Sequence, residues 1–256
     1  MQRWNLPEIE DQPWCPAWLR EAMTGYLQTV IGLTRPYASA APAVADLLRA
    51  SGSAQIVDLC SGAGGPWPDL GEAVEREVGH DVEIVLTDLH PNPGTIERAP
   101  RTRYIREPVS ALAVPSGLVG VRTLFTALHH FSPAQVETLL STAQQDRAAF
   151  GAFEATHRSV KGMLITCLIP LLVLVFMPRV RPLRWQTVVF TYLIPLIPVA
   201  IWWDGMASTL RTYRAEEIET ILRTLPSAPF RWSVREVPVD GAPVPMLQVI
   251  GQPTGS

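Results

Sequence analysis

Cysteine and lysine are scarce in this chain of 256 residues. The three cysteines, Cys15, Cys60 and Cys167, lie far apart and form no C-x-x-C pair, so the sequence predicts neither a zinc site nor a disulfide framework. Lys161 is the only lysine, and the basic residues form nothing longer than a short arginine run. With a net charge of −3, this composition argues against nucleic acid as the main partner. We expect no metal and no nucleic acid.

A signal-peptide pattern and internal repeats are also missing. Pro7 and Glu8 stand where the apolar region of a signal peptide would lie, so the sequence predicts a cytoplasmic protein rather than a secreted one. The length suits one α/β domain with an elaboration. We therefore expect a single domain over residues 1–256.

Two apolar runs of the sequence end in an acid. The first, Ile-Val-Asp at 56–58, continues into Leu-Cys-Ser-Gly-Ala-Gly-Gly at 59–65. This pattern predicts a buried strand that leads through a tight glycine-rich turn into a helix, where the backbone can approach a nucleotide-like ligand. The second run, residues 82–88, ends in Asp88. In doubly wound sheets an acid at this point accepts hydrogen bonds from ribose hydroxyls.

The glycine spacing distinguishes between families of nucleotide-binding proteins. Cys60 occupies the first glycine position of the dinucleotide motif G-x-G-x-x-G, and the loop lacks the phosphate-binding lysine of G-x-x-x-x-G-K-[ST]. This spacing disfavours an NAD-dependent oxidoreductase and predicts no NADH binding. Asp58, Gly62 and Gly64 instead resemble the first motif, D-x-x-x-G-x-G, of the class I S-adenosylmethionine (SAM)-dependent methyltransferases. The resemblance covers about residues 40–160 and the C-terminal end.

The resemblance implies both a fold and a cofactor. The implied fold is α/β, a Rossmann-like doubly wound, mostly parallel seven-stranded sheet, and this sequence adds an apolar helical insertion after strand five. The cofactor is SAM. The methionine end of SAM is expected at Asp58, Ser61, Gly62 and Gly64. The ribose is expected at Asp88 and Leu89, and the adenine at Val109 and Ser110. Ser110 stands where an aspartate is common in the family, and a hydroxyl accepts a weaker hydrogen bond than a carboxylate.

Further patterns predict the remaining helices and strands. Ser132 followed by Pro133 is typical of a helix N-cap with proline at the first helical position. Amphipathic spacing predicts helices at 17–33 and 40–51. Residues 211–218 resemble the tyrosine-and-acid start of the last helix in many class I methyltransferases, and this resemblance implies a last helix that ends near Leu225. Proline, asparagine and glycine predict a turn at 89–94. Apolar runs predict strands at 104–108 and 150–155, and a further strand that begins at 121 and whose exit reaches 131. Alternating residues predict an antiparallel hairpin at 230–239 and 245–251.

Two histidines and an acid are the candidate catalytic residues. The sequence Leu-His-His-Phe at 128–131 follows the fourth predicted strand and looks like the fourth motif of small-molecule methyltransferases. Either histidine can take a proton from a substrate or line its pocket, or one of them packs against the neighbouring helix and bonds a carbonyl. Glu154 ends the fifth strand, at the edge where open parallel sheets bind ligands. His130 is the first candidate proton acceptor, Glu154 the second, and His129 a substrate contact.

The N-terminal residues 1–36 hold several tryptophans and prolines ahead of an amphipathic run. Such a segment either packs on the edge of the sheet or folds over the mouth of the ligand site. We describe residues 1–36 as an N-terminal cap segment, with Trp14 as a candidate substrate contact.

Residues 162–205 depart from an ordinary methyltransferase. Two apolar runs, 163–177 and 188–203, flank a segment that carries Arg179, Arg181 and Arg184. As helices these runs would reach only about 24 Å, less than the membrane core of about 30 Å. Prolines interrupt both runs, and a hairpin would place the arginines on the far side of the membrane, against the positive-inside tendency. Two helices that form an apolar cap over the carboxyl ends of the strands are therefore favoured over two membrane spans.

The partner of this cap and the role of its last residues stay open at this point. The cap can bury itself on the domain, against a second subunit in a homodimer, or in one leaflet with its arginines at the headgroups, which would make the protein peripheral at the inner face of the membrane. Trp203 and Asp204 close the insertion and can hold a substrate hydroxyl or the sulfonium, or Asp204 can cap the helix that follows.

These features predict a SAM-dependent methyltransferase that transfers a methyl group to a small lipophilic acceptor. SAM is already an activated donor, so the main task of such an enzyme is to align the acceptor and exclude water. The alternative is a non-catalytic protein of the same fold that uses its apolar insertion to bind a membrane or a protein partner.

Overall fold

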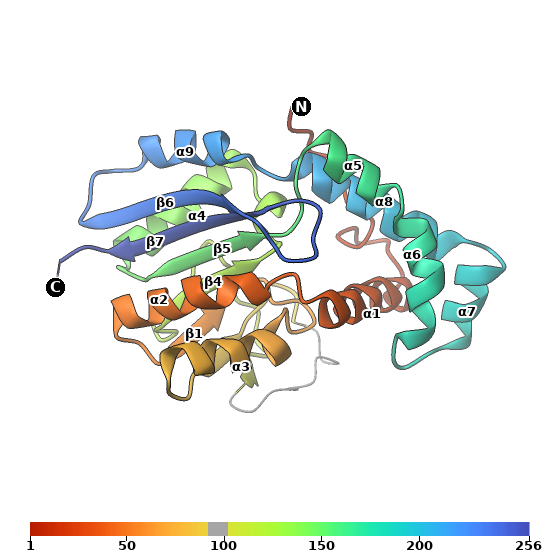
Figure 1. Cartoon of the computed structure of the whole chain (residues 1–256), viewed down its shortest axis with the longest axis horizontal. Coiled ribbons are helices and arrows are strands. Elements are labelled where there is room, and N and C mark those ends of the chain that lie inside the picture. The colour runs from red at the N-terminus through yellow and green to blue at the C-terminus, as the bar shows by residue number, and fades with distance from the viewer. Residues whose placement is uncertain (92–101, 256) are drawn as a thin grey trace. The chain divides into compact units, whose positions relative to one another are not determined.

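The computed structural model describes residues 1–91 and 102–255, and the predicted turn at 89–94 extends beyond them. The chain divides into two compact units (Figure 1). The sheet unit consists of residues Pro36–Ala155 and Tyr213–Ser256. The helical unit consists of Met1–Arg35 and Thr156–Thr212, and so extends beyond the segments 1–36 and 162–205 that the sequence singled out.

The sheet unit contains a seven-stranded sheet with the order β3-β2-β1-β4-β5-β7-β6 (Figure 1). Its strands are β1 (Gln55–Asp58), β2 (Glu83–Leu86), β3 (Thr102–Tyr104), β4 (Val121–Phe125), β5 (Phe150–Glu154), β6 (Phe230–Val237) and β7 (Met246–Pro253). The first five strands are parallel, and β7 runs antiparallel to both β5 and β6. This architecture confirms the predicted fold class, including the C-terminal hairpin.

Helices pack against the sheet, and the residues of its central strands are mostly buried. All five residues of β5 are buried, as a parallel strand covered on both faces requires. The helices of this unit are η1 (Ala38–Ala40), α2 (Ala41–Ser51), α3 (Trp67–Val78), η2 (Leu128–His130), α4 (Pro133–Gln145) and α9 (Ala215–Thr224). α4 begins with the predicted cap: the Ser132 hydroxyl accepts the Gln135 N–H, and the Gln135 side chain accepts the Ser132 N–H.

The third strand lies earlier in the chain than the sequence predicts. It covers Thr102–Tyr104 instead of residues 104–108. Pro108 has no N–H to donate to a neighbouring strand, and the next N–H, that of Val109, bonds the Asp88 carbonyl at 2.8 Å. The chain therefore leaves the ladder and turns back across the end of β2.

The helical unit contains more helices than the two predicted for its apolar insertion. Its elements are α1 (Ala17–Thr34), α5 (Val160–Thr166), α6 (Ile169–Phe176), η3 (Met177–Arg179), α7 (Trp185–Tyr192) and α8 (Leu196–Arg211). α1 confirms the helix predicted at 17–33. The prediction of two helices at 163–177 and 188–203 is wrong, because Pro170 lies in the first turn of α6 and Pro195 is the N-cap of α8. Proline is accommodated where a helix begins and breaks one in its interior.

The helical stretch that contains the first apolar run, 163–177, is longer than the sequence predicted. The helical stretch Val160–Arg179 has 20 residues and is long and apolar enough, by length and composition, to cross a membrane. α7 and α8 pass the same test only as a pair, with a bend of 77° between them. The sequence-based length of 163–177 was too short because the helical stretch begins before the continuous apolar run and ends after it.

Asp204 does not cap a following helix, which was one of the two roles that the sequence left open, because it lies inside α8. Its carboxylate accepts the N–H groups of Ile9 at 2.6 Å and Glu10 at 3.0 Å. Trp203 donates its indole N–H to the Pro7 carbonyl at 2.9 Å. These bonds hold the N-terminal segment on α8, and burial raises the pKa of Asp204 to about 6.

Glu10 makes the stability of this unit dependent on pH. Burial, followed by the charges of Glu8 and Asp204, raises the pKa of Glu10 from 4.5 to about 8. Because its pKa is raised in the folded state, the folded chain holds the Glu10 proton more tightly than the unfolded chain does. Protonated Glu10 therefore contributes fully to the stability below pH 4.5, and this contribution is lost as the pH rises through 8. Glu10→Gln is expected to raise the free energy of unfolding at high pH by about 2 kcal/mol and to leave it unchanged at low pH.

Urea unfolding of the chain and of Glu10→Gln, once below pH 4.5 and once above pH 8, measures this effect. Glu72→Gln, a change of the same type at an exposed position of α3, is the control and should show no pH-dependent gain. An equal effect of the two substitutions at high pH would contradict the assignment to Glu10.

Candidate functional site

The loop between β1 and α3 has the backbone geometry of a ligand-binding turn. Four of its residues have a positive φ: Cys60 (58°), Gly62 (52°), Gly64 (104°) and Gly65 (55°). Glycine adopts this left-handed conformation without steric cost. A Cβ added at Gly62 would meet no heavy atom within 4 Å, so the backbone there borders open space. The loop can therefore admit a ligand close to its main chain.

Asp58, at the end of β1, stabilises the conformation of this loop. Its carboxylate accepts the hydroxyl of Ser61 at 2.7 Å and that of Thr123 at 2.7 Å. Asp58 and Ser61 are both buried. Burial raises the pKa of Asp58 to about 6, although the two hydroxyls oppose the shift. The first acid of the motif therefore positions the turn through its hydrogen bonds to other side chains.

Asp88 lies directly against the glycine loop. Because β1 and β2 are parallel neighbours, with Asp58 paired to Leu86, their carboxyl ends meet at the same edge of the sheet. The Asp88 carboxylate accepts the N–H of Gly62 at 2.9 Å and the N–H of His90 at 2.8 Å. A carboxylate has room for further hydrogen bonds beyond these two. The two places that the sequence singled out are thus close enough for one nucleoside to contact both.

The predicted adenine residues lie beside Asp88. The Val109 N–H donates to the Asp88 carbonyl at 2.8 Å, and the Val109 side chain is buried. The Ser110 hydroxyl accepts the Leu112 N–H at 3.2 Å. Leu89, the residue after Asp88, is exposed. The structure therefore brings Gly62, Asp88, Val109 and Ser110 together at the carboxyl ends of neighbouring strands.

The ends of β4 and β5 carry a buried histidine–carboxylate pair. One oxygen of Glu154 accepts the Leu128 N–H at 2.7 Å, and the other lies 2.8 Å from Nδ1 of His129. Both side chains of this pair are 2% exposed. His129 therefore bonds a carboxylate rather than the carbonyl that the sequence considered.

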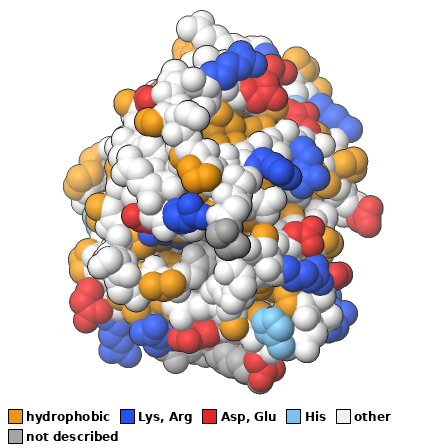
Figure 2. Space-filling view, turned by 90° about the vertical axis from the view of Figure 1, so that its left-hand side faces the viewer, with side chains coloured by type: hydrophobic (Ala, Val, Ile, Leu, Met, Phe, Trp, Pro, Cys, Tyr) orange, Lys and Arg blue, Asp and Glu red, His pale blue; other side chains and the backbone are white. Residues whose placement is uncertain are grey.

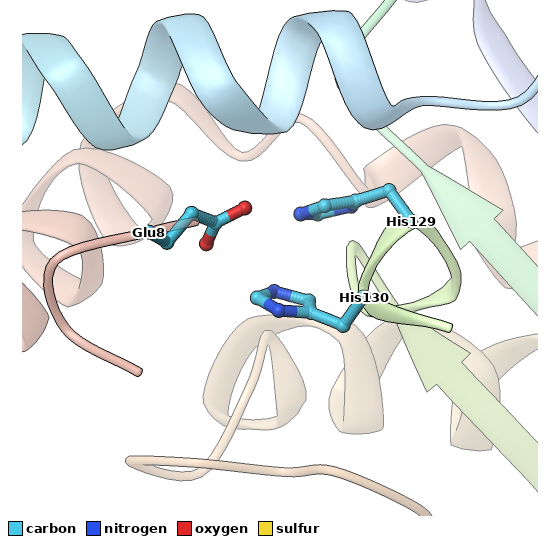
Figure 3. Close-up of side chains that lie close together, drawn as sticks. All are labelled: Glu8, His129 and His130. Carbon is cyan, nitrogen blue, oxygen red and sulfur yellow. The ribbon is translucent and has the colours of Figure 1, made fainter. Parts of the chain in front are cut away.

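His130 differs from His129 in its exposure. The two rings project from the same short turn, η2, with their centroids 4.3 Å apart (Figure 3). His130 is half-buried, whereas His129 is buried. Of the two, His130 is therefore the better placed to meet a substrate.

Tyr37 meets Thr126 just after β4, a contact that the sequence did not suggest. Their hydroxyls form a hydrogen bond, and the Thr126 hydroxyl also accepts the Ala155 N–H at 3.2 Å. Thr126 has a φ of 46°, an uncommon conformation for a residue with a branched side chain. Burial raises the pKa of Tyr37 above its usual value. These bonds connect the residues that follow β4 and β5. No local sequence pattern predicts a contact between residues so far apart in the chain.

Trp14, Trp203 and Asp204 belong to the helical unit. Trp14 is 67% exposed, and Trp203 and Asp204 make the contacts with the N-terminal segment given above. Their assignment as substrate contacts stays a prediction.

Comparisons with known proteins find similarity in structure alone. The sequence matches no protein-family model and no curated protein. The structure of the plantazolicin methyltransferase BpumL in complex with SAH is similar to this chain with a TM-score of 0.57 and 11% sequence identity, over 96% of this chain and 93% of that chain. The plantazolicin methyltransferase BamL, in complex with a triazolic desmethylPZN analog and SAH, has a TM-score of 0.52 and 8% identity, over 93% and 98% of the two chains. The chain therefore has the class I SAM-dependent methyltransferase fold, as its motif predicted.

Proposed function

We propose that this chain, which has the class I methyltransferase fold, transfers a methyl group from SAM to a small lipophilic acceptor. The observation that carries the proposal is the 2.9 Å hydrogen bond between the Gly62 N–H and the Asp88 carboxylate, which joins a loop open to a ligand with an acid suited to ribose hydroxyls. The SAH bound to BpumL and BamL supports SAM as the cofactor.

Each part of SAM has a group of residues to hold it. Asp88 accepts the ribose hydroxyls, with Leu89 beside it, and the backbone at Gly62 and Gly64 admits the methionine end. Val109 and Ser110 meet the adenine. Asp58 and Ser61 act one step away, because their polar groups are buried in bonds that shape the loop. SAM supplies the activated methyl group, and the chain binds it, orients it and excludes water.

The acceptor side of the proposal centres on η2. His130 is the proposed proton acceptor, since it is half-buried next to the carboxyl ends of the strands. Both oxygens of Glu154 are engaged with Leu128 and His129, so we assign Glu154 the role of positioning this turn. The triazolic desmethylPZN analog bound to BamL supports a small-molecule acceptor.

Calorimetric titration of the intact protein tests the proposal. SAM and SAH are expected to bind, and NADH is expected to give no heat. Absence of binding for both SAM and SAH would instead favour a non-catalytic protein whose function lies in its apolar helices.

Gly62→Ala is expected to weaken SAM binding at least about tenfold, because the new methyl group enters the space that the ligand occupies. Gly241→Ala is the matched control: Gly241 also has a positive φ, 74°, and open space around its Cβ position. Both substitutions place alanine in the left-handed region and share that backbone cost. Equal SAM affinities for the two variants would show that the ligand does not approach Gly62.

A further inference from the structure

Large apolar side chains are exposed along the outer side of the helical stretch Val160–Arg179. Leu164, Leu168, Leu171 and Val175 are each more than half exposed. Their spacing of four, three and four residues places them on one stripe of a helix. Val173 and Met177, on the opposite side, are fully buried in the core of the helical unit. One side of this stretch is therefore covered by protein, and the other is apolar without a protein cover within the described part of the unit.

The exposed stripe continues onto the next helix and its ends. Trp185 at the start of α7 is 68% exposed, and Leu193 after its end is 75% exposed. Ile194 and Tyr192 are exposed beside Leu193. A contiguous run of exposed leucine, valine, tryptophan and tyrosine is rare on a monomeric soluble protein and marks a surface that contacts protein or membrane. We call the exposed apolar side chains of α5, α6 and α7, together with Leu193 and Ile194, the apolar surface.

The charged side chains that residues 155–203 contribute are all basic, and Glu21 of α1 pairs with one of them, Arg184. No aspartate or glutamate occurs between Glu154 and Asp204, although the whole chain has 24 acidic and 21 basic residues. The exposed charged residues within this interval are Lys161, Arg179, Arg181 and Arg184. On the face of the molecule drawn in Figure 2, which is the side at the left of Figure 1, acidic and basic side chains are interspersed. The apolar surface is thus coupled to a local positive charge in a chain whose net charge is negative.

The arginines lie at the turn between α6 and α7 and keep their charges near backbone carbonyls. Arg179 donates to the Val175 carbonyl at 3.1 Å, and Arg181 donates to the Pro178 carbonyl at 2.7 Å. Arg184 pairs with Glu21 of α1 at 2.7 Å. With Trp185 and Tyr192 nearby in sequence, this turn has the composition that membrane proteins place at the headgroup level.

A second copy of the chain fits the same surface poorly. In a two-fold dimer the same patch of both copies faces itself. Glu21 pairs with Arg184, but Arg179 and Arg181 of one copy would then face the same arginines of the other, and residues 155–203 contain no acid to offset their repulsion. A surface of anionic lipid has the opposite charge and offers acyl chains to the leucine stripe.

We propose that the apolar surface inserts into one leaflet of an anionic bilayer, with its leucine stripe toward the acyl chains and its arginines at the headgroups. The protein-covered side of Val160–Arg179 favours insertion from one face over a crossing of the whole bilayer. This proposal stands independently of methyl transfer and places the protein peripherally at a membrane.

Co-sedimentation of the full chain with vesicles tests the proposal. The protein should bind vesicles of about three parts phosphatidylcholine to one part phosphatidylserine better than pure phosphatidylcholine vesicles, and binding should weaken as NaCl rises from about 50 mM to about 500 mM. Leu193→Gln should lower vesicle affinity about tenfold. Val119→Gln, at an equally exposed position of the sheet unit (72%), should leave it unchanged.

A second variant separates charge from apolar insertion. Arg179→Gln combined with Arg181→Gln should lower affinity for the anionic vesicles about tenfold and change binding to pure phosphatidylcholine little. Failure to bind vesicles, equal binding of Leu193→Gln and Val119→Gln, or a dimer that sediments without vesicles would overturn the proposal. Release from membranes only by detergent, and not by alkaline carbonate, would show a spanning protein and overturn it as well.

Discussion

Replacing Asp88 by alanine is expected to weaken SAM binding about 100-fold. Its carboxylate is half-buried at the end of β2 and already accepts the N–H groups of Gly62 and His90. Two further charge-assisted bonds from ribose hydroxyls would be lost with the side chain, and the Gly62 N–H would lose its acceptor. Calorimetry with SAM measures the change directly.

Asp81→Ala is the control for this substitution. Asp81 is an exposed acid just before β2, at the opposite end of the strand from Asp88, so its removal changes the net charge equally. It should leave SAM affinity unchanged. If Asp88→Ala bound SAM as tightly as Asp81→Ala, the ribose would not be held at Asp88 and the proposed site would be misplaced.

Replacing Glu154 by alanine is expected to lower the free energy of unfolding by about 3 kcal/mol, because the change leaves the buried His129 and the Leu128 N–H without their acceptor. Glu154→Gln keeps an oxygen for the Leu128 N–H and should lose less. Urea unfolding of the two variants and of the unmodified chain measures the difference.

His130→Gln separates catalysis from stability at the same turn. His130 is half-buried, so this change should alter the free energy of unfolding little. It should reduce turnover of the acceptor, because the proposed proton acceptor is lost. A loss of stability as large as that of Glu154→Ala would assign His130 a structural role instead.

The acidic residues at the ends of the strands divide into two kinds. Asp58 and Glu154, at the ends of β1 and β5, are 1% exposed, and other groups of the sheet unit use both oxygens of each. Asp88, after β2, is half-buried and bonds the backbone beside open space. The buried acids therefore shape the loops that Asp88 and His130 use to meet ligands. The sequence assigned cofactor or catalytic contact to all four residues, because their distance from solvent has no local signal.

The membrane proposal depends on a similar distinction. The apolar character of 163–177 and 188–203 is evident from the residues, but a buried helix and an inserted helix have the same composition. Only the burial of Val173 and Met177, together with the exposure of Leu164 and Leu171, separates the two sides of the stretch.

The positions of most strands along the chain, the glycine turn, the capped helix after Ser132 and the C-terminal hairpin follow from local patterns, because periodicity and turn chemistry act between residues close in the chain. The doubly wound arrangement of the sheet was implied by the family resemblance of the glycine turn. The breaks at Pro170 and Pro195 and the bonds of Asp204 to the N-terminal segment became known only from the folded chain. The same holds for the pairing of Glu154 with His129 and of Gly62 with Asp88. These contacts join segments that are distant in the chain and come together only in the folded structure. Their free energy depends on both segments, so no single stretch of sequence predicts them.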